Sequence, residues 1–205
     1  PRDAPSRPLD VLVQHLVTVA AGTGFTADFL AGHSLGEYNA LLAAGVFDFG
    51  TGLRLVKRRG ELMGAAAEGS MAAVIGQEAD AIRRVLQSHQ LDDIDVANFN
   101  TPTQLVLAGK RASIEKAEKV FNGLGTRCVV LNVSAPFHSR YMADAAREFD
   151  AFSRQFHFEP PRIPVIANVT ARPYGANDVR ETLCRQIASP VQWVDSIRYL
   201  MAQQA

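Results

Sequence analysis

The sequence predicts an α/β protein in which a small unit of strands and helices is inserted into a larger α/β domain. In the first third of the chain, one strand-like stretch is flanked by helical patterns. Between Gly69 and Val133 the pattern changes to short strands separated by two helices. Beyond residue 134 the helical spacing of the first third returns, so we expect the middle third to be an insertion.

The first third of the chain predicts three helices and one strand. The stretch "LDVLVQHLVTVA", residues 9–20, carries apolar residues at helical spacing and ends before a Gly-x-Gly turn. The stretch "FTADFLAGHS" predicts a short strand, and a second helix follows it as far as Ala44. Asp48 is suited to cap a third helix that ends near Gly64, because its side chain can accept a hydrogen bond from the first turn.

The inserted unit follows the order βαββαβ. Strands are predicted for "SMAAVIG", "DVANFN", "QLVLAG" and "RCVVLNV", and helices for "EADAIRRVLQSH" and "SIEKAEKVFNGLG". The two middle strands form a hairpin about Thr101 and Pro102. This order predicts a ferredoxin-like unit over residues 68–133, inserted between residues 1–67 and 134–205 of the larger domain.

The last third of the chain returns to the larger domain. "SAPFHSRYMADAAREFDAFSRQF" has helical spacing, and "RIPVIANVT" predicts a strand. Two further helices are predicted for "VRETLCRQI" and "PVQWVDSIRYLMAQQ". The strands of the larger domain are therefore expected to be separated by helices, as in α/β folds.

The composition excludes several classes of function. The 21 basic and 21 acidic residues cancel, so no overall field attracts nucleic acid or an anionic membrane. Cys128 and Cys184 lie far apart without a Cys/His cluster, which argues against a metal site or a disulfide framework and fits a reducing cytoplasm. No apolar run in the sequence is long enough to span a bilayer. We therefore expect a cytoplasmic protein that recognises its partners at a local site.

The stretch "GHSLG" places Ser34 between Gly32 and Gly36, after a predicted strand and before a predicted helix. This G-x-S-x-G pattern is typical of the nucleophile elbow of α/β-hydrolase-like domains, in which glycines allow a tight turn and the serine hydroxyl is lifted clear of the backbone. The backbone N–H of Leu35, at the positive end of the following helix, is suited to stabilise an oxyanion. The alternative is a serine that caps the helix within a tight loop.

A nucleophilic serine needs a base, and histidine is the usual partner near neutral pH. His138 lies in "SAPFHSRYM", between a predicted strand and a predicted helix, where functional loops occur. His33 adjoins Ser34, but neighbouring side chains in an extended segment point to opposite sides. His138 is therefore the preferred base and His33 the alternative.

Six blocks carry a resemblance to a known family: "GHSLGEYNAL", "LVKRRGELM", "GSMAAVIG", "VANFNTPTQLVLAG", "APFHSRYM" and "RQIASPVQWVDSI". Their order and spacing resemble the malonyl-CoA:acyl-carrier-protein transacylase family, which includes acyltransferase domains of polyketide synthases. The resemblance implies that Ser34 is the acylated nucleophile, that His138 is its base, and that a backbone carbonyl near Gln186 orients the histidine. It implies no bound cofactor, because CoA or phosphopantetheine arrives with the substrate.

The same resemblance assigns Arg59, in "KRRGELM", to the carboxylate of a malonyl group. A guanidinium offers a planar pair of donors that matches a carboxylate. The alternative is that Lys57, Arg58 and Arg59 form a solvated helix face. Met63 lies one helical turn further along the same face, either as a wall of the acyl pocket or as a core residue.

Three further residues are implied in substrate contact. Asn100 and Gln104 are expected in the turn between two inserted strands, with their amides facing the cleft between the domains, although turn formation explains Asn100 equally well. Phe137 matches an aromatic position of malonyl-selective members, whereas members that use methyl-branched substrates tend to carry a smaller residue. A bulky ring there leaves little room for an α-methyl group, or it serves packing alone.

The resemblance implies transfer of a malonyl group from malonyl-CoA to the phosphopantetheine thiol of an acyl carrier protein, in fatty acid or polyketide biosynthesis. Ketosynthase or other synthase domains are then further partners. Two alternatives stay open: a hydrolase of the same fold that clears acyl groups from carrier proteins, and a noncatalytic docking module. The charge of Arg59 argues against the hydrolase, and an intact Ser34 and His138 argue against the docking module.

Two parts typical of the family are not found in the sequence. Family members begin with a strand that bears a glutamine-rich loop, which supplies a second oxyanion donor, and end with a Gly-Pro-Gly segment. We therefore expect the chain to be a fragment of a longer protein. The fragment by itself is expected to be poorly active, because loss of one oxyanion donor costs about 10²–10³ in rate.

Overall fold

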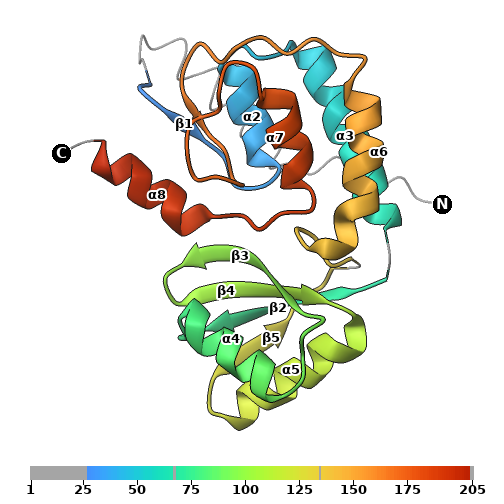
Figure 1. Ribbon diagram of the computed structural model, residues 1–205, viewed down its shortest axis with the longest axis vertical. Coiled ribbons are helices and arrows are strands. Elements are labelled where there is room, and N and C mark those ends of the chain that lie inside the picture. Colours follow the sequence, from blue (N-terminus) through green and yellow to red (C-terminus); the bar gives the residue numbers. More distant parts are fainter. Residues whose placement is uncertain (1–26, 67, 134, 204–205) are drawn as a thin grey trace.

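The structure, a computed structural model, describes residues 27–66, 68–133 and 135–203. It consists of two parts stacked one above the other, and the small part is built from the middle of the chain (Figure 1). The helix predicted for residues 9–20 lies outside the described residues. The other predicted helices and strands are present in the predicted order.

Four helices of the larger part share one apolar core. They are α2 (Gly36–Ala43), α3 (Phe49–Ala65), α6 (Ala143–Ser153) and α7 (Val179–Gln186). Leu41, Leu55, Phe149 and Leu183, one from each helix, are completely buried in this core. Helix α6 packs against both α3 and α7, whereas α8 (Trp193–Ala202) lies against the small part.

Helix α3 begins where the sequence predicts. The Asp48 side chain accepts a hydrogen bond from the backbone N–H of Thr51 at 2.6 Å and so caps the helix. The helix ends at Ala65, one residue beyond the predicted end. The cap fixes the register of α3, which carries Arg59 and Met63 on one face.

The two strands of the larger part are shorter than predicted. Strands β1 (Leu30–Ala31) and β6 (Val165–Ile166) pair in parallel over two residues each. Gly32 ends β1, because the backbone turns there towards Ser34. Beyond β6 the backbone N–H of Asn168 donates to a side chain, Glu37 Oε1 at 3.0 Å, and not to a neighbouring strand. Side-chain hydrogen bonds thus replace the strand ladder next to Ser34.

The small part has the predicted element order. It consists of β2 (Ser70–Ile75), α4 (Ala79–Ser88), β3 (Asp95–Thr101), β4 (Gln104–Gly109), α5 (Arg111–Gly123) and β5 (Arg127–Val130). The strands form one antiparallel sheet in the order β3-β4-β2-β5.

Side chains of the small sheet alternate between two apolar layers, as the two-residue period of a strand requires. Leu105 and Leu107 of β4 pack with α4 and α5, whereas Val106 between them packs on the opposite face with Met71 and Phe137. The sheet therefore lies between its own two helices and the larger part (Figure 1).

Backbone hydrogen bonds join the two parts. The N–H of Phe99 in β3 donates to the carbonyl of Val191 at 2.9 Å, and the N–H of Val191 donates to the carbonyl of Ala97 at 2.9 Å. Asn98 therefore pairs with Val191 in an isolated parallel bridge. This bridge fixes β3 against the segment that leads into α8.

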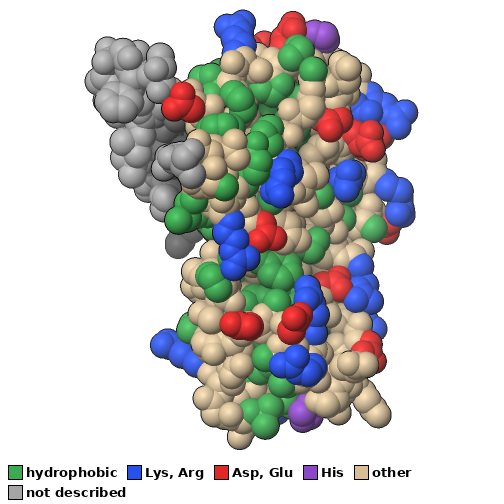
Figure 2. All heavy atoms as spheres, turned by 60° about the vertical axis from the view of Figure 1, so that its left-hand side comes forward, with side chains coloured by type: hydrophobic (Ala, Val, Ile, Leu, Met, Phe, Trp, Pro, Cys, Tyr) green, Lys and Arg blue, Asp and Glu red, His purple; other side chains and the backbone are tan. Residues whose placement is uncertain are grey.

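The surface carries charges of both signs. Basic and acidic side chains are interspersed over the face in Figure 2, in keeping with the 21 basic and 21 acidic residues of the chain. In the described ranges no helix is long and apolar enough to cross a membrane. In the same ranges, His, Cys, Asp and Glu side chains form no group of three or more that could hold a metal ion.

Candidate active site

Ser34 lies between β1 and α2 with a left-handed backbone, at φ 53°. This conformation is unusual for a residue with a Cβ atom and is typical of a nucleophile elbow. The side chain of Asn168 holds the turn from two sides. Its Oδ1 accepts from the N–H of Ser34 at 2.6 Å, and its Nδ2 donates to the carbonyl of Gly32 at 2.7 Å. The strained turn is thus fixed by a residue distant in sequence.

Only one of the two glycines that flank Ser34 is required by close packing. A Cβ atom on Gly32 would lie 2.1 Å from the backbone of Gly36, which no side chain tolerates. A Cβ atom on Gly36 would meet nothing within 4 Å. Close packing therefore requires glycine at position 32 and does not require it at position 36.

His138 bonds the serine hydroxyl. Its Nε2 lies 2.6 Å from Ser34 Oγ, and its Nδ1 lies 3.0 Å from the backbone carbonyl of Gln186. Because a carbonyl only accepts, Nδ1 carries the proton and the lone pair of Nε2 faces the hydroxyl. The serine proton therefore has an acceptor in place.

Burial keeps the imidazole of His138 neutral. Desolvation, aided by the positive charge of Arg59, lowers the pKa of His138 to about 3. The side chain can thus take up the serine proton without first losing one of its own at neutral pH.

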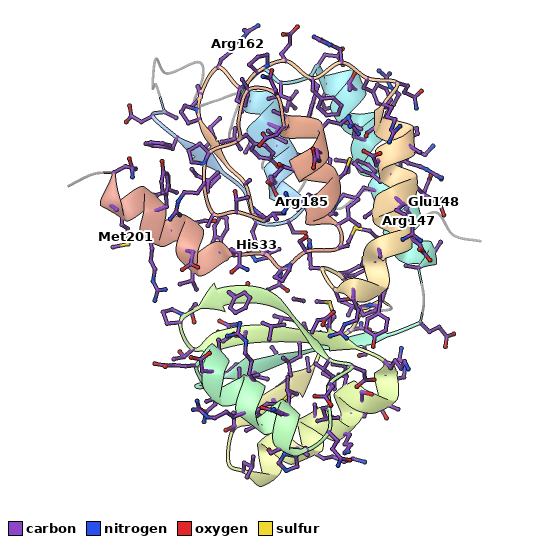
Figure 3. All side chains as sticks on the ribbon, in the orientation of Figure 1. His33, Arg147, Glu148, Arg162, Arg185 and Met201 are labelled. Atoms are coloured by element: carbon purple, nitrogen blue, oxygen red, sulfur yellow. The ribbon has the colours of Figure 1, made fainter. Side chains whose placement is uncertain are left out.

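His33 has other partners. Its Nε2 donates to Asn100 Oδ1 of the small part at 2.9 Å, and its ring contacts the Trp193 ring edge-on with 5.3 Å between centroids. Figure 3 shows His33 at the junction between the two parts. His33 thus connects the elbow to the small part, whereas His138 contacts the nucleophile.

Arg59 is buried beside the same hydroxyl. Its Nη2 donates to Ser34 Oγ at 2.9 Å and to Gln186 Oε1 at 3.3 Å, and the guanidinium lies over the Tyr38 ring. Only 7% of Arg59 is exposed, so the interpretation as a solvated helix face is wrong for this residue. Arg58, in contrast, is on the surface and pairs with Glu148.

The guanidinium of Arg59 keeps unused donor capacity. Its Nε is buried and has no hydrogen-bond partner among the described residues. A buried cation without full pairing is costly, so a site of this kind is stabilised when an anion enters.

A cavity of about 410 Å³ connects these groups. Met63 and Phe137 form part of its wall, as predicted, and Met63 also belongs to the core of the larger part. The lining residues come from both parts of the molecule and are His33, Ser34, Arg59, Gly60, Met63, Gly64, Met71, Asn98, Val106, Leu131, Phe137 and His138.

The structure corrects the placement of Asn100 and Gln104. Both lie in strands and not in the turn, because β3 extends to Thr101 and β4 begins at Gln104, which leaves two residues for the turn. Asn100 contacts His33, and neither Asn100 nor Gln104 belongs to the cavity wall. The amide in the wall is that of Asn98, which sequence reasoning missed.

Leu35 occupies the position required of an oxyanion donor. It follows Ser34 directly and is the N-cap residue of α2, so its backbone N–H lies at the positive end of the helix. The position agrees with the prediction, and the role itself stays a prediction.

Comparison with known proteins identifies the family. The family model for the acyl transferase domain matches residues 12–204. The chain belongs to this family. The resemblance inferred from the six sequence blocks is thereby confirmed.

Relatives of this acyl transferase domain have more specific names. The chain is 54% identical over 176 residues to the polyketide biosynthesis malonyl CoA-acyl carrier protein transacylase BaeC of Bacillus velezensis, covering 85% of this chain. It spans only 61% of that relative's length. The malonyl CoA-acyl carrier protein transacylase of Burkholderia pseudomallei shares 50% identity and a TM-score of 0.90, over 94% of this chain and 67% of that one.

A second similar structure contains a protein partner. It is a malonyl-transacylase, PlMCAT, in complex with the type II PKS acyl-carrier protein AntF. The similarity has a TM-score of 0.86 and 34% identity, and it covers 95% of this chain and 64% of that chain.

Besides Asn98, sequence reasoning missed the buried polar residues Glu37 and Asn168 of this site. Glu37 stands within "GHSLGEY", and the only local signal is a carboxylate in an otherwise apolar stretch. Asn168 has no local signal, since its partners lie 134 and 136 residues away. Both residues hold the turn at Ser34: Asn168 bonds the backbone of Ser34 and Gly32, and Glu37 bonds the backbone N–H of Asn168.

A second cavity also reaches His138. It has a volume of about 610 Å³ and lies between α4, β3 and the segments that follow His138 and Ala188. Arg83 and Arg140 are among its wall residues. His138 therefore stands at the border of two cavities, one of which contains Ser34 and Arg59.

Proposed function

We propose that the protein containing this chain transfers a malonyl group from malonyl-CoA to the phosphopantetheine thiol of an acyl carrier protein through a Ser34 acyl-enzyme. The observation that carries the proposal is the convergence on one hydroxyl: Ser34 Oγ contacts both His138 Nε2, at 2.6 Å, and Arg59 Nη2, at 2.9 Å. A neutral base and a buried cation at one serine match a substrate with a thioester at one end and a carboxylate at the other.

In the first half-reaction, Ser34 Oγ attacks the thioester carbonyl carbon while its proton passes to His138 Nε2. The N–H of Leu35 stabilises the tetrahedral oxyanion. The C–S bond then breaks, the CoA sulfur takes the proton from His138, and malonyl remains as an ester on Ser34. In the second half-reaction the carrier thiol attacks this ester in the same way. The backbone carbonyl of Gln186 stabilises the protonated imidazole formed in each half-reaction.

Arg59 distinguishes malonyl from neutral acyl groups. Its place in the cavity wall suits a bidentate contact between the guanidinium and the malonyl carboxylate. Met63 and Phe137 supply apolar walls beside it, and the ring of Phe137 disfavours an α-methyl substituent. Hydrolysis of neutral acyl groups would leave this buried charge without a partner, which favours the transferase over the hydrolase.

The second cavity suits the long arm that both substrates share. A pantetheine chain ends in the reacting sulfur and must approach Ser34 alongside His138, and His138 lines this cavity as well. We assign Asn98, which lines the cavity beside Ser34, to a polar contact with the substrate, in place of the pair Asn100 and Gln104. The names of BaeC and of the PlMCAT complex support an acyl carrier protein as the second substrate. A noncatalytic docking module would not need the neutral base beside Ser34.

The fold supports a finer classification as part of this proposal. The turn that carries Ser34 between β1 and α2 supports the proposal that residues 1–67 and 134–205 belong to an α/β-hydrolase-like domain. The order βαββαβ and the antiparallel sheet are those of a ferredoxin-like unit, over residues 68–133.

The cellular setting is part of the same proposal. Cys128 and Cys184 are both free thiols and buried, which suits a reducing cytoplasm. The protein holds no cofactor of its own in this proposal, and CoA or phosphopantetheine enters and leaves with each substrate. Other synthase domains, such as a ketosynthase, consume the malonyl-carrier product.

Intact-mass spectrometry after incubation with malonyl-CoA tests the proposal. We expect one malonyl adduct on the protein that contains this chain, no adduct on Ser34→Ala, and a normal adduct on the control Ser88→Ala, whose hydroxyl lies exposed on α4. The wild-type adduct should persist in buffer and disappear when a phosphopantetheine thiol is added. Labelling of Ser34→Ala would disprove the elbow mechanism, and loss of the adduct in buffer without a thiol would indicate the hydrolase.

A further inference from the structure

Glu37, on the first turn of α2, is a completely buried carboxylate that accepts three hydrogen bonds. Its Oε1 accepts from the Tyr174 hydroxyl at 2.5 Å and from the backbone N–H of Asn168 at 3.0 Å. Its Oε2 accepts from Gln186 Nε2 at 2.6 Å. The reaction described above gives this side chain no role.

The carboxylate allows only one orientation of the Gln186 amide. An ionised carboxylate only accepts, so the amide NH₂ must face Glu37, where it also donates to the carbonyl of Ser34 at 2.8 Å. The amide oxygen then faces the opposite way and accepts from Arg59 Nη2 at 3.3 Å. In the flipped orientation two donors would meet at Arg59 and two acceptors at Glu37.

Gln186, the residue that Glu37 orients, contacts three residues of the proposed mechanism, Ser34, His138 and Arg59. The backbone carbonyl of Gln186 accepts from His138 Nδ1, its amide NH₂ bonds the backbone of Ser34, and its amide oxygen bonds Arg59. If the Gln186 amide is displaced, the Arg59 guanidinium loses the oxygen to which it donates and changes position.

We propose that Glu37 is a positioning residue for acyl selectivity: it fixes the Gln186 amide so that the amide oxygen holds the Arg59 guanidinium where a malonyl carboxylate binds. This inference rests on the proposed function of Arg59. Burial opposes a charge at this position and raises the pKa of Glu37 to about 7, while the three donors and Arg59 act in the opposite direction. A neutral residue would avoid this cost but would release the Gln186 amide.

The variant Glu37→Gln tests this role because it keeps the shape of the side chain and replaces one acceptor by a donor. The Gln186 amide is then free to flip and present its NH₂ to Arg59, which displaces the guanidinium. We expect kcat/KM for malonyl-CoA to fall about 10–100-fold, the size of effect seen when groups that orient metal ligands are removed. The kcat/KM for acetyl-CoA should change much less, because acetyl has no carboxylate.

Tyr174→Phe is the matched control. It removes a hydrogen bond to the other oxygen of the same carboxylate and leaves the contact with Gln186 in place. This variant should lose stability but keep the malonyl-to-acetyl ratio of kcat/KM. Equal losses for both acyl groups in Glu37→Gln, or a ratio altered as much by Tyr174→Phe, would overturn the proposal.

A measurement on the wild-type protein keeps the proposal testable if Glu37→Gln does not fold. The Gln186 side-chain NH₂ should show slow hydrogen exchange and a downfield NMR shift, as a buried donor to a carboxylate does. Exchange as fast as that of exposed glutamine would overturn the proposal. Absence of a malonyl adduct on Ser34 of the wild-type protein would reject the proposed function itself, so the two failures are distinguishable.

Discussion

The core of the larger part and the helix-covered core of the small part bury different kinds of side chain. Among the apolar residues of the larger core lie a carboxylate, a guanidinium and two amides, from Glu37, Arg59, Asn168 and Gln186. The core between the small sheet and helices α4 and α5 is built mainly from apolar side chains, from Ala72 to Cys128, and its buried polar residues, such as Ser70 and Thr126, are uncharged. Burial of polar groups costs free energy unless each is paired, so the larger core depends on hydrogen-bond geometry and the small core on packing.

This difference separates two kinds of mutational effect. In the larger core, a change that leaves the volume intact but removes one hydrogen-bond partner should alter rate or selectivity. In the small core, a change of volume should alter the free energy of unfolding and leave chemistry at Ser34 unchanged. Four predictions test the separation, beginning with the largest expected effect.

His138→Ala should lower kcat for malonyl transfer by about 10²–10⁴ with KM nearly unchanged, because it removes a proton acceptor and little contact area. Steady-state kinetics with malonyl-CoA measure both constants. His157→Ala is the control, since this histidine is 82% exposed and pairs with Glu159 on the surface. An unaltered rate in His138→Ala would transfer the role of base to another group, and His33 would be tested next.

Arg59→Ala should cost malonyl transfer about 2–5 kcal/mol, the range for loss of one partner of a buried charge pair. Acetyl transfer should hold steady or rise, because acetyl does not use the charge. Arg59→Lys should restore part of the malonyl activity, since a point charge does not reproduce the bidentate geometry. The measurement is kcat/KM for both acyl-CoA substrates.

The matched control for Arg59→Ala is Arg58→Ala, one residue away on the exposed face of α3, where the side chain pairs with Glu148. We expect no change in selectivity for this variant. Equal losses of acetyl and malonyl transfer in Arg59→Ala would mean that Arg59 supports the fold, and the hydrolase would regain support.

Leu107→Ala should destabilise the protein by about 2–5 kcal/mol, because it opens a cavity in the small core. Urea unfolding gives this free energy. At a temperature where both proteins are folded, the rate of Ser34 malonylation should equal that of the wild type. Val129→Ala, on a side chain that is 41% exposed, is the control for stability. A fall in labelling rate with full folding would show that the two cores are coupled.

The smallest effect is expected from pH. Because the pKa of His138 is lowered to about 3, the neutral base persists in mild acid, and the rate of Ser34 acetylation by acetyl-CoA, which does not use Arg59 or Glu37, should stay level between about pH 7 and about pH 5. Quenched-flow labelling of Ser34 at several pH values between about 7 and about 5 measures this rate. A half-loss near pH 6.5, the ordinary histidine value, would contradict the buried neutral base.

The buried side chains of His138 and Glu37 change the stability of the protein with pH in opposite directions. The unfolded state binds a proton at His138 before the folded state does, so the stability contributed by this residue declines as pH falls below about 6.5. The raised pKa of Glu37 means that the folded state binds its proton first. Its contribution is therefore present at low pH and is lost as pH rises from about 4.5 towards about 7.

Local patterns in the sequence were sufficient to predict the order of the helices and strands and to select Ser34 and His138 as nucleophile and base. The cap at Asp48, the turn at Gly32 and the alternation along β4 depend on neighbouring residues, and each was predictable. The burial of Arg59 was not, because it depends on Tyr38 and Gln186, which other elements bring to α3. The strands of the larger part were overestimated in length, since side-chain hydrogen bonds near Asn168 replace the ladder.

The hydrogen bonds among Glu37, Asn168 and Gln186 could not be predicted from any local pattern. Glu37 and Gln186 are 149 residues apart in sequence, and their contact requires α2 and α7 to pack side by side. The misplacement of Asn100 and Gln104 has a different cause: the hairpin turn uses only Pro102 and Thr103, so both residues belong to the strands on either side of it. Asn98 lies inside β3, and its place in the cavity wall depends on how β3 packs against the larger part, which no local pattern contains.

The contrast between Gly32 and Gly36 bears on how relatives of this chain are recognised. A methyl group at position 32 would collide with the start of α2, whereas one at position 36 would point into open space. A five-letter motif that demands glycine at both ends is therefore stricter than the packing of this fold requires, and it would pass over any relative with alanine at the second position. We expect divergence within the family to spare the first glycine and to erode the second.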